Sequence, residues 1–163
     1  MNINESKVEI ILYRTQRDEK LAEISQLMAA VFDEFIAPGY DPQGIEVFSE
    51  YIQPQAIGDR LKRNHFLLVA ILNQKIIGVL EMRNHNHLSL LFVTKSQQRQ
   101  GIAKKLVQQA TNYCLREEPD LTKLTVHSDP KAVPAYAAMG FTVTGSERVE
   151  DGIRYIPMTR KIQ

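Results

Sequence analysis

The chain has 163 residues, of which 44% are hydrophobic and 24% charged, and its formal net charge is +1. This length and composition predict one soluble globular domain with a sizeable core, and the near-neutral charge gives no indication of a nucleic-acid or membrane-surface partner. The single cysteine, Cys114, excludes an internal disulfide and fits a cytoplasmic location. Residues 1–5 lack the basic and apolar segments of a signal peptide, and no apolar run is long enough to cross a bilayer.

The first third of the chain is predicted to form one strand and three helices. Residues 8–13 are a short apolar run typical of a strand. From residue 18 onward, apolar residues recur every three or four positions, which predicts an amphipathic helix that ends near Pro38. Residues 44–52 predict a second helix, and residues 57–63 a short third one.

The middle of the chain is predicted to form a meander followed by a crossover. Residues 65–72 and 75–83 form a β-hairpin around a two-residue turn, and residues 87–93 add a third strand. The helix that follows carries its apolar stripe from Ile102 onward, and residues 121–127 form the next strand. A strand, a helix and a strand in this order predict a right-handed crossover between two parallel strands.

The last segments complete the predicted fold class. A short helix over residues 130–139 precedes two strands at 141–144 and 153–158, which a charged loop joins. The chain is therefore predicted to be α+β (α/β), with a mixed, mostly antiparallel sheet of six to seven strands. A parallel βαβ unit lies at its centre, and helices cover both faces.

The turn after residues 87–93 is predicted to bind an anion. The first backbone N–H groups of a helix have no intrahelical acceptor, and this end of the helix carries a partial positive charge. Gly101 lets a bulky anion approach the backbone closely. A dinucleotide-binding motif would need two further glycines here, and a P-loop would need Gly-Lys-Ser/Thr. We call the backbone of residues 98–104 the anion cradle.

Two motifs on these elements resemble those of the GCN5-related N-acetyltransferases (GNAT). Gln98-x-x-Gly101-x-Ala103 resembles the acetyl-CoA motif of the family, and residues 135–141, which end in Tyr-x-x-x-Gly-Phe, resemble its downstream helix-and-strand block. The resemblance covers residues 64–161. It implies one acetyltransferase domain over residues 1–163, with an acetyl-CoA-binding core at 65–163 and acceptor-side helices at 1–64.

The resemblance implies acetyl-CoA as co-substrate and no metal. The pantetheine arm would lie along the 87–93 strand and pair with the backbone of Leu91 and Val93, and the Val93 amide would stabilise the oxyanion. His127 would contact the pantetheine or a water molecule. The pyrophosphate would bind the anion cradle, helped by two basic side chains. The residues implied in cofactor binding are Leu91, Phe92, Val93, Gln98, Arg99, Gln100, Gly101, Ile102, Ala103, Lys104, His127 and Tyr136.

Acetyl transfer also needs an acid for the leaving thiolate and a base for the amine. Tyr136 matches the general-acid tyrosine of the family, and the competing interpretation is a core aromatic. Candidate bases are His87, Glu81 and His127. By strand alternation, His87 is predicted to share a face with Ser89, Leu91 and Val93; it could also simply cap the hairpin turn. Glu81 could instead pair with Arg83.

Two other patterns were considered for the site. His85 and His87 could face one way and bind a metal, but no third ligand lies at zinc spacing. Acidic residues in the helical first third could line a pocket for a cationic amine or form a solvated helix face. These residues are Asp33, Glu34, Asp41, Glu46 and Glu50.

The sequence therefore predicts an acetyl-CoA-dependent N-acetyltransferase. The acetyl group would pass directly to a primary amine of a small molecule, peptide or protein, because Cys114 lies inside a helix away from the thioester. The alternative is a non-catalytic acyl-CoA-binding regulatory module that lacks a functional base. Members of the family often form homodimers, and residues 141–158 are the expected contact surface.

Overall fold

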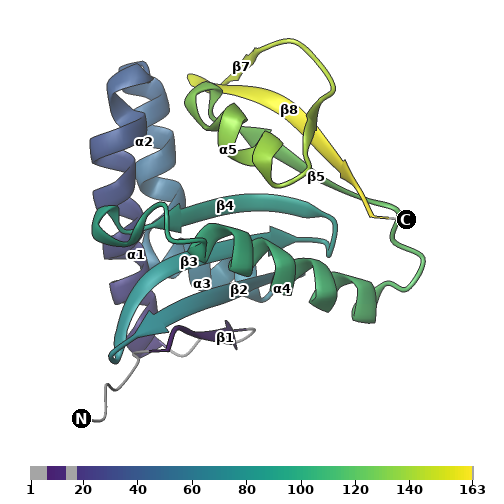
Figure 1. Cartoon of the computed structure of the whole chain (residues 1–163). Helices are drawn as coiled ribbons and strands as arrows, with labels where there is room; N and C mark the ends of the chain where they lie inside the picture. The colour runs from purple at the N-terminus through teal and green to yellow at the C-terminus, as the bar shows by residue number, and fades with distance from the viewer. Residues whose placement is uncertain (1–6, 14–17, 163) are drawn as a thin grey trace.

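The computed structural model describes residues 7–13 and 18–162, so the segment 1–5 considered for a signal peptide lies outside the described residues. The described strands form a sheet in the order β1-β2-β3-β4-β5-β8-β6, and β7 pairs with β8 (Figure 1). Among these pairs, β4 and β5 run parallel and the others antiparallel. The strands are β1 (Glu9–Tyr13), β2 (His65–Leu72), β3 (Lys75–Arg83), β4 (His87–Val93), β5 (Lys123–Ser128), β6 (Thr142–Val143), β7 (Arg148–Glu150) and β8 (Ile153–Lys161).

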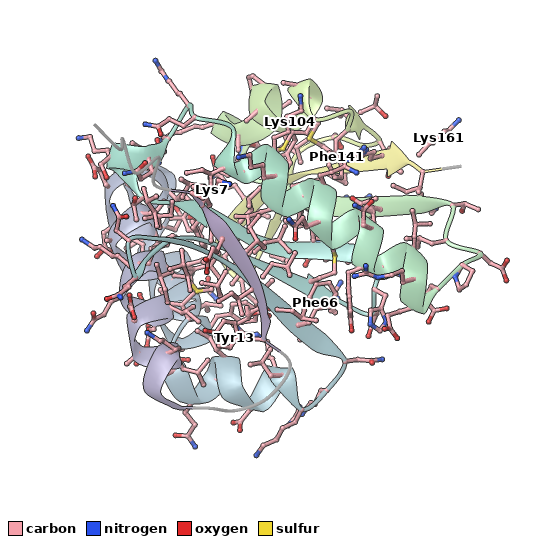
Figure 2. All side chains as sticks on the ribbon, turned by 60° about the horizontal axis from the view of Figure 1, so that its bottom comes forward. Lys7, Tyr13, Phe66, Lys104, Phe141 and Lys161 are labelled. Carbon is pink, nitrogen blue, oxygen red and sulfur yellow. The ribbon has the colours of Figure 1, made fainter. Side chains whose placement is uncertain are left out.

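Helices cover both faces of this sheet. On one face lie α1 (Asp18–Val31), α2 (Pro42–Tyr51) and α3 (Pro54–Leu61), and on the other lie α4 (Ile102–Glu117) and α5 (Val133–Ala138) (Figure 1). Each face has its own hydrophobic core. Phe66 on β2 and Phe141 after α5 both belong to the core on the α4 side (Figure 2). Among the described residues, no helix combines the length and the apolar character needed to cross a membrane.

These features confirm the predicted fold class, including the parallel β4–α4–β5 unit at the centre of the sheet. The hairpin turn at Asn73 and Gln74 has positive φ at both residues, as its two-residue length requires. The loop predicted over 146–152 instead contains the short strand β7. This strand has only three residues, which is too short for an alternating pattern to reveal it in the sequence, and its side chains are exposed.

One extra residue interrupts the pairing of β4 with β3. Met82 lies opposite Leu88 and Glu81 opposite Leu90, so Ser89 has no partner in β3. The pairing of β4 with β5 is limited to the same region, because only His87 and Leu88 have partners there. Beyond the bulge, β4 and β5 diverge (Figure 1), and the edge of β4 that faces β5 has no partner strand in the described part of the chain.

The extra residue also corrects the prediction that His87 shares a face with Leu91 and Val93. Leu88, Leu91 and Val93 all contact the core on the α4 side, whereas His87 and Leu90 lie on the α2 side. Side chains alternate along a strand with a period of two, so one inserted residue reverses the faces of all that follow. The side chain of His87 therefore lies on the opposite face of the sheet from the side chains of Leu91 and Val93.

The turn between β7 and β8 touches the first turn of α2 through backbone atoms. A Cβ added to Gly44 would lie 2.3 Å from the Gly152 carbonyl oxygen, and a Cβ added to Gly152 would lie 2.6 Å from the Gly44 nitrogen. Gly152 also has a φ of +80°, which disfavours other residues. Because neither glycine has a side chain, the backbones of α2 and of the β7–β8 turn are in direct contact.

We predict that Gly44→Ala destabilises the protein by about 1 to 3 kcal/mol, because the new methyl group forces α2 and the β7–β8 turn apart. Alanine is more favourable than glycine in a helix by roughly 1 kcal/mol, so without this contact the substitution would be expected to stabilise the protein. Gly39→Ala is the control, because its Cβ would lie 3.6 Å from the Lys131 side chain. Denaturant unfolding measures both, and a Gly44→Ala protein as stable as the wild type would contradict the prediction.

Candidate active site

The open edge of β4 presents backbone N–H groups toward the space where β5 has diverged. The amide of Thr94 donates to the Ile77 carbonyl on β3 at 2.8 Å. Successive amides of a strand point to opposite sides, so those of Leu91 and Val93 point away from β3. The Val93 carbonyl lies on the same open side, where it accepts a hydrogen bond from Gln98 Nε2 at 3.0 Å. Leu91 and Val93 can therefore pair with an extended ligand lying along β4.

The anion cradle lies at the end of this edge. Gly101 precedes α4 with φ +81°, no side chain caps the helix, and the first helical bond runs from the Lys105 amide to the Gly101 carbonyl at 3.0 Å. The amides of residues 102–104 therefore have no helical acceptor. Apart from the chain neighbours of Gly101, no heavy atom of residues 7–13 and 18–162 lies within 4 Å of a Cβ added to Gly101, so this backbone is accessible to a bulky phosphate.

The side chains around the cradle divide into two groups. Arg99, Gln100 and Lys104 are exposed, and Lys104 projects from the first turn of α4 (Figure 2). Phe92 and Ile102 are buried, one in each core. The predicted contribution of Phe92 and Ile102 to cofactor binding is thus limited to their backbone, and charge complementarity comes from the exposed basic side chains.

Tyr136 lies on α5, on the same side of the sheet as α4. Its ring meets Phe141 edge-on with the centroids 5.6 Å apart, and the residue is 9% exposed. Burial raises the pKa of the phenol, and the negative charge of Asp129 raises it further. The hydroxyl therefore stays protonated at neutral pH, which is the state that a general acid requires.

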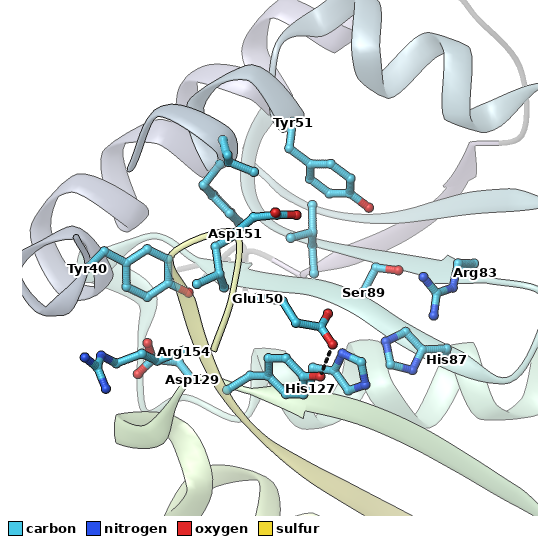
Figure 3. Close-up of a pocket in the computed structure, with 15 residues that line it drawn as sticks. Tyr40, Tyr51, Arg83, His87, Ser89, His127, Asp129, Glu150, Asp151 and Arg154 are labelled. Atoms are coloured by element: carbon cyan, nitrogen blue, oxygen red, sulfur yellow. Dashed lines mark hydrogen bonds between the residues drawn. The ribbon is translucent and has the colours of Figure 1, made fainter. Parts of the chain in front are cut away.

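A pocket of about 260 Å³ opens on the other face of the β4–β5 junction, beneath α2 (Figure 3). We call it the α2 pocket. Its walls come from α2 and the turn before it, from β3 and β4, from β5, and from β7 and β8. The lining residues are Tyr40, Val47, Phe48, Tyr51, Arg83, His87, Ser89, Leu90, His127, Asp129, Glu150, Asp151, Ile153, Arg154 and Tyr155.

Two of the three predicted bases, His87 and His127, meet in this pocket, with ring centroids 4.7 Å apart. Nδ1 of His87 lies 2.7 Å from Thr125 Oγ1. Burial lowers the pKa of His87 to about 4, and nearby positive charges act in the same direction. His127 is exposed and stacks on Tyr155; burial and the Arg83 charge lower its pKa as well. Both imidazoles are therefore neutral at pH 7.

Glu81 does not line the α2 pocket. Its carboxylate is fully buried and accepts hydrogen bonds from Arg60 Nε and Nη2 at 2.7 and 3.0 Å, with His65 Nδ1 at 2.8 Å. Burial alone would raise the pKa of this carboxyl, but the bonds from His65 and Arg60 outweigh burial and lower it. The partner of Glu81 is thus Arg60, and not Arg83 as the sequence suggested.

The network around Glu81 nevertheless supports the pocket wall. The Arg60 guanidinium lies over the ring of Tyr51, 3.6 Å from the centroid, and Nη1 donates to the Tyr51 carbonyl at 2.6 Å. Tyr51 lines the α2 pocket. Glu81 therefore fixes Arg60, which in turn fixes the end of α2 and the orientation of this tyrosine.

The other two patterns found in the sequence lie elsewhere in the structure. His85 packs on Phe66 and Tyr113, away from the His87 ring, and no group of three potential metal ligands occurs among the described residues. None of the five acidic residues considered for an acceptor pocket lines the α2 pocket; Glu34, for example, pairs with Lys95 at the surface. The acidic side chains that do line it are Asp129, Glu150 and Asp151.

Sequence reasoning missed most of the pocket, including Arg83, Asp129 and Tyr155 as lining residues. The one available signal was Asp129, because it follows β5 at the end nearest the divergence from β4 and precedes the helix with Tyr136. Nothing in the local sequence indicates that residues 150–155 approach α2.

Comparison with known proteins gives consistent matches. The family model for an acetyltransferase (GNAT) domain matches residues 36–162. Peptidyl-lysine N-acetyltransferase YjaB of Salmonella typhimurium is 29% identical over 138 residues, which is 85% of this chain and 86% of that protein. The crystal structure of the PaiA N-acetyltransferase of Thermoplasma acidophilum, in complex with coenzyme A, has a TM-score of 0.78 at 16% identity, over 96% of this chain and 99% of that chain. The solution structure of apo YjaB from Escherichia coli has a TM-score of 0.67 at 21% identity, over 95% and 97% of the two chains.

We predict that Glu81→Gln lowers the free energy of unfolding by about 3 to 5 kcal/mol at pH 7, because the Arg60 charge is left buried without its counter-charge. The pKa of Glu81 is lowered in the folded state, so its stabilisation is present above the ordinary value of 4.5 and is lost as the pH falls through the lowered value. Urea unfolding measures this effect. Glu34→Gln removes a surface partner and should leave the midpoint unchanged; equal effects of the two substitutions would contradict the prediction.

Proposed function

The chain belongs to the GNAT acetyltransferase family, and we propose that it transfers the acetyl group of acetyl-CoA directly to a primary amine of a small molecule, peptide or protein. The observation that carries this proposal is the junction of β4 with α4. There, an unpaired strand edge and an uncapped helix start follow one another and match the extended arm and the pyrophosphate of coenzyme A. The coenzyme A bound in the similar PaiA structure supports acetyl-CoA as the donor.

Each part of the donor would meet a different part of the chain. The pyrophosphate would accept hydrogen bonds from the backbone of the anion cradle and ion pairs from Arg99 and Lys104. The pantetheine would pair with Leu91 and Val93, whose amides face the open side of β4. The thioester would then lie near the bulge at Ser89, between α5 on one side and the α2 pocket on the other.

The acceptor would enter through the α2 pocket. Direct transfer is favoured because Cys114 is fully buried in α4 and burial raises its thiol pKa to about 12, so it cannot serve as an acyl carrier. The printed name of the Salmonella relative makes a lysine side chain one candidate acceptor. A single domain, a cytoplasmic location and a homodimer formed through residues 141–158 are further parts of the proposal.

We propose Tyr136 as the acid and His127 as the base. The burial of Tyr136 keeps its phenol protonated, ready to donate to the departing thiolate. His127 is neutral, exposed in the α2 pocket and bonded to no side chain among the described residues, whereas His87 is engaged with Thr125. Glu81 is left out of this role because Arg60 and His65 occupy its carboxylate.

We expect Tyr136→Phe to lower kcat by roughly 10²- to 10⁴-fold while the Kd for acetyl-CoA stays unchanged, because only the acidic proton is removed. Thiol release from acetyl-CoA with a panel of amines measures the turnover, and calorimetry measures the Kd. Tyr13→Phe on β1 is the matched control. Unchanged kcat at saturating substrates would exclude Tyr136 as the acid.

The pH dependence of kcat/KM should distinguish the two histidines. Below its pKa the imidazole of the base is protonated and cannot accept the amine proton, so kcat/KM falls with falling pH. We expect His127→Asn to remove the enzyme's contribution to this acid limb and to lower kcat/KM by roughly 10²-fold, whereas His87→Asn retains the limb. Protonation of the amine substrate also lowers kcat/KM at low pH, but this effect is the same for the wild type and for both variants. Retention of the full limb in His127→Asn would assign the base elsewhere.

A further inference from the structure

The α2 pocket contains a cation and a hydroxyl that have no hydrogen-bond partner of good geometry in the described part of the chain. The side chain of Arg83, at the end of β3, is exposed and makes no hydrogen bond or ion pair with any described residue. The Ser89 hydroxyl is buried and has no hydrogen-bond partner of good geometry among those residues, although it lies close enough to the Tyr51 hydroxyl to act on its pKa. Native structures rarely leave a buried hydroxyl unpartnered unless a ligand or an ordered water molecule binds it.

These two groups lie together on one side of the pocket. Figure 3 shows Arg83 and Ser89 next to each other, with the Tyr51 hydroxyl directed toward them. Arg83 lies close enough to act on three neighbours: after burial, its positive charge helps to lower the pKa of His87 and His127, and it opposes the rise that burial causes in the pKa of Tyr51. The neighbouring histidines are neutral, so this side of the pocket offers one positive charge and hydroxyl donors.

Carboxylates gather on the opposite side, where Arg154 also lies and pairs with Glu147 at 3.8 Å. Figure 3 shows Asp129 across the pocket from Arg83, with His127 between them. Glu150 accepts a hydrogen bond from the Tyr155 hydroxyl at 2.9 Å. Asp129 lies close enough to Tyr136 to raise the pKa of its phenol. Asp129 thus lies toward the acid of the proposed reaction, and Arg83 lies across the pocket from Asp129.

The pocket is also small and partly covered. Its volume of about 260 Å³ is slightly below the range of roughly 300–1,000 Å³ that is typical of ligand pockets. The backbone contact between Gly44 and Gly152 joins α2 to the β7–β8 turn, and both of these elements line the pocket. This arrangement fits a small molecule better than the surface of a folded protein.

We infer that the acceptor is a small amine that also carries a carboxylate group, which Arg83 and the Ser89 hydroxyl bind while the amine points toward Asp129 and His127. This inference rests on the proposed function and narrows its acceptor class. Arg83 would then determine specificity, because a guanidinium and a carboxylate form paired, charge-assisted hydrogen bonds.

Matched acceptors that differ only in the carboxylate test this inference. We would compare 4-aminobutanoic acid, 6-aminohexanoic acid and Nα-acetyl-lysine with their primary amides, together with a lysine peptide that has an amidated end and no acidic residue. We expect kcat/KM for the preferred acid to exceed that of its amide by about ten- to hundredfold, mainly through KM. Arg83→Gln should abolish this preference and Arg83→Lys restore part of it. Arg63→Gln removes an exposed charge outside the pocket and should retain it.

Binding without turnover separates this inference from the proposed function. With coenzyme A present, calorimetry would compare the N-acetylated products of the acids and of the amides on the wild type and on Arg83→Gln. If the acids bind more tightly than the amides and this difference requires Arg83, the inference is supported even when no amine is acetylated. A lack of acetylation would count against the proposed function alone. Three outcomes would overturn the inference. These are equal use or binding of acids and amides, a preference for the neutral peptide, and an acid preference that survives Arg83→Gln.

Discussion

One inserted residue in β4 determines the geometry on which the proposed site depends. Ser89 has no partner in β3, and just before it the pairing of β4 with β5 stops. A continuous sheet would leave no room between these strands, because neighbouring strands lie only about 4.8 Å apart. The bulge therefore accounts for the unpaired amides of Leu91 and Val93 on one side and for the position of His87 in the α2 pocket on the other.

The far wall of that pocket depends on a second constraint, the buried charge pair between Glu81 and Arg60. Replacing such a pair by well-packed apolar residues often costs no stability, so the pair is weak evidence for a stabilising role. Its geometry indicates another role, because the same guanidinium holds the carbonyl and the ring of Tyr51. Together with the contact between Gly44 and Gly152, it sets where α2 lies relative to the sheet.

The sequence predicted the order of the elements and the anion cradle, because both depend on local patterns such as alternation, turn residues and the Gln98-x-x-Gly101-x-Ala103 spacing. It could not predict the bulge, which is defined only by the pairing of β4 with β3. The partner of Glu81 lies 21 residues away in sequence on another element, so charge spacing suggested the nearer Arg83. The lining of the α2 pocket was missed for the same reason, since four separate regions of the chain meet there.

The most direct test is to titrate the isotope-labelled protein with coenzyme A and follow the backbone amide chemical shifts. If the donor lies along β4 and in the anion cradle, the largest changes should fall on Leu91, Val93 and residues 99–104. The amides of Leu90 and Phe92, which point toward β3, should change less. Changes that leave Leu91, Val93 and the cradle unaffected would contradict the assignment of this edge as the donor site.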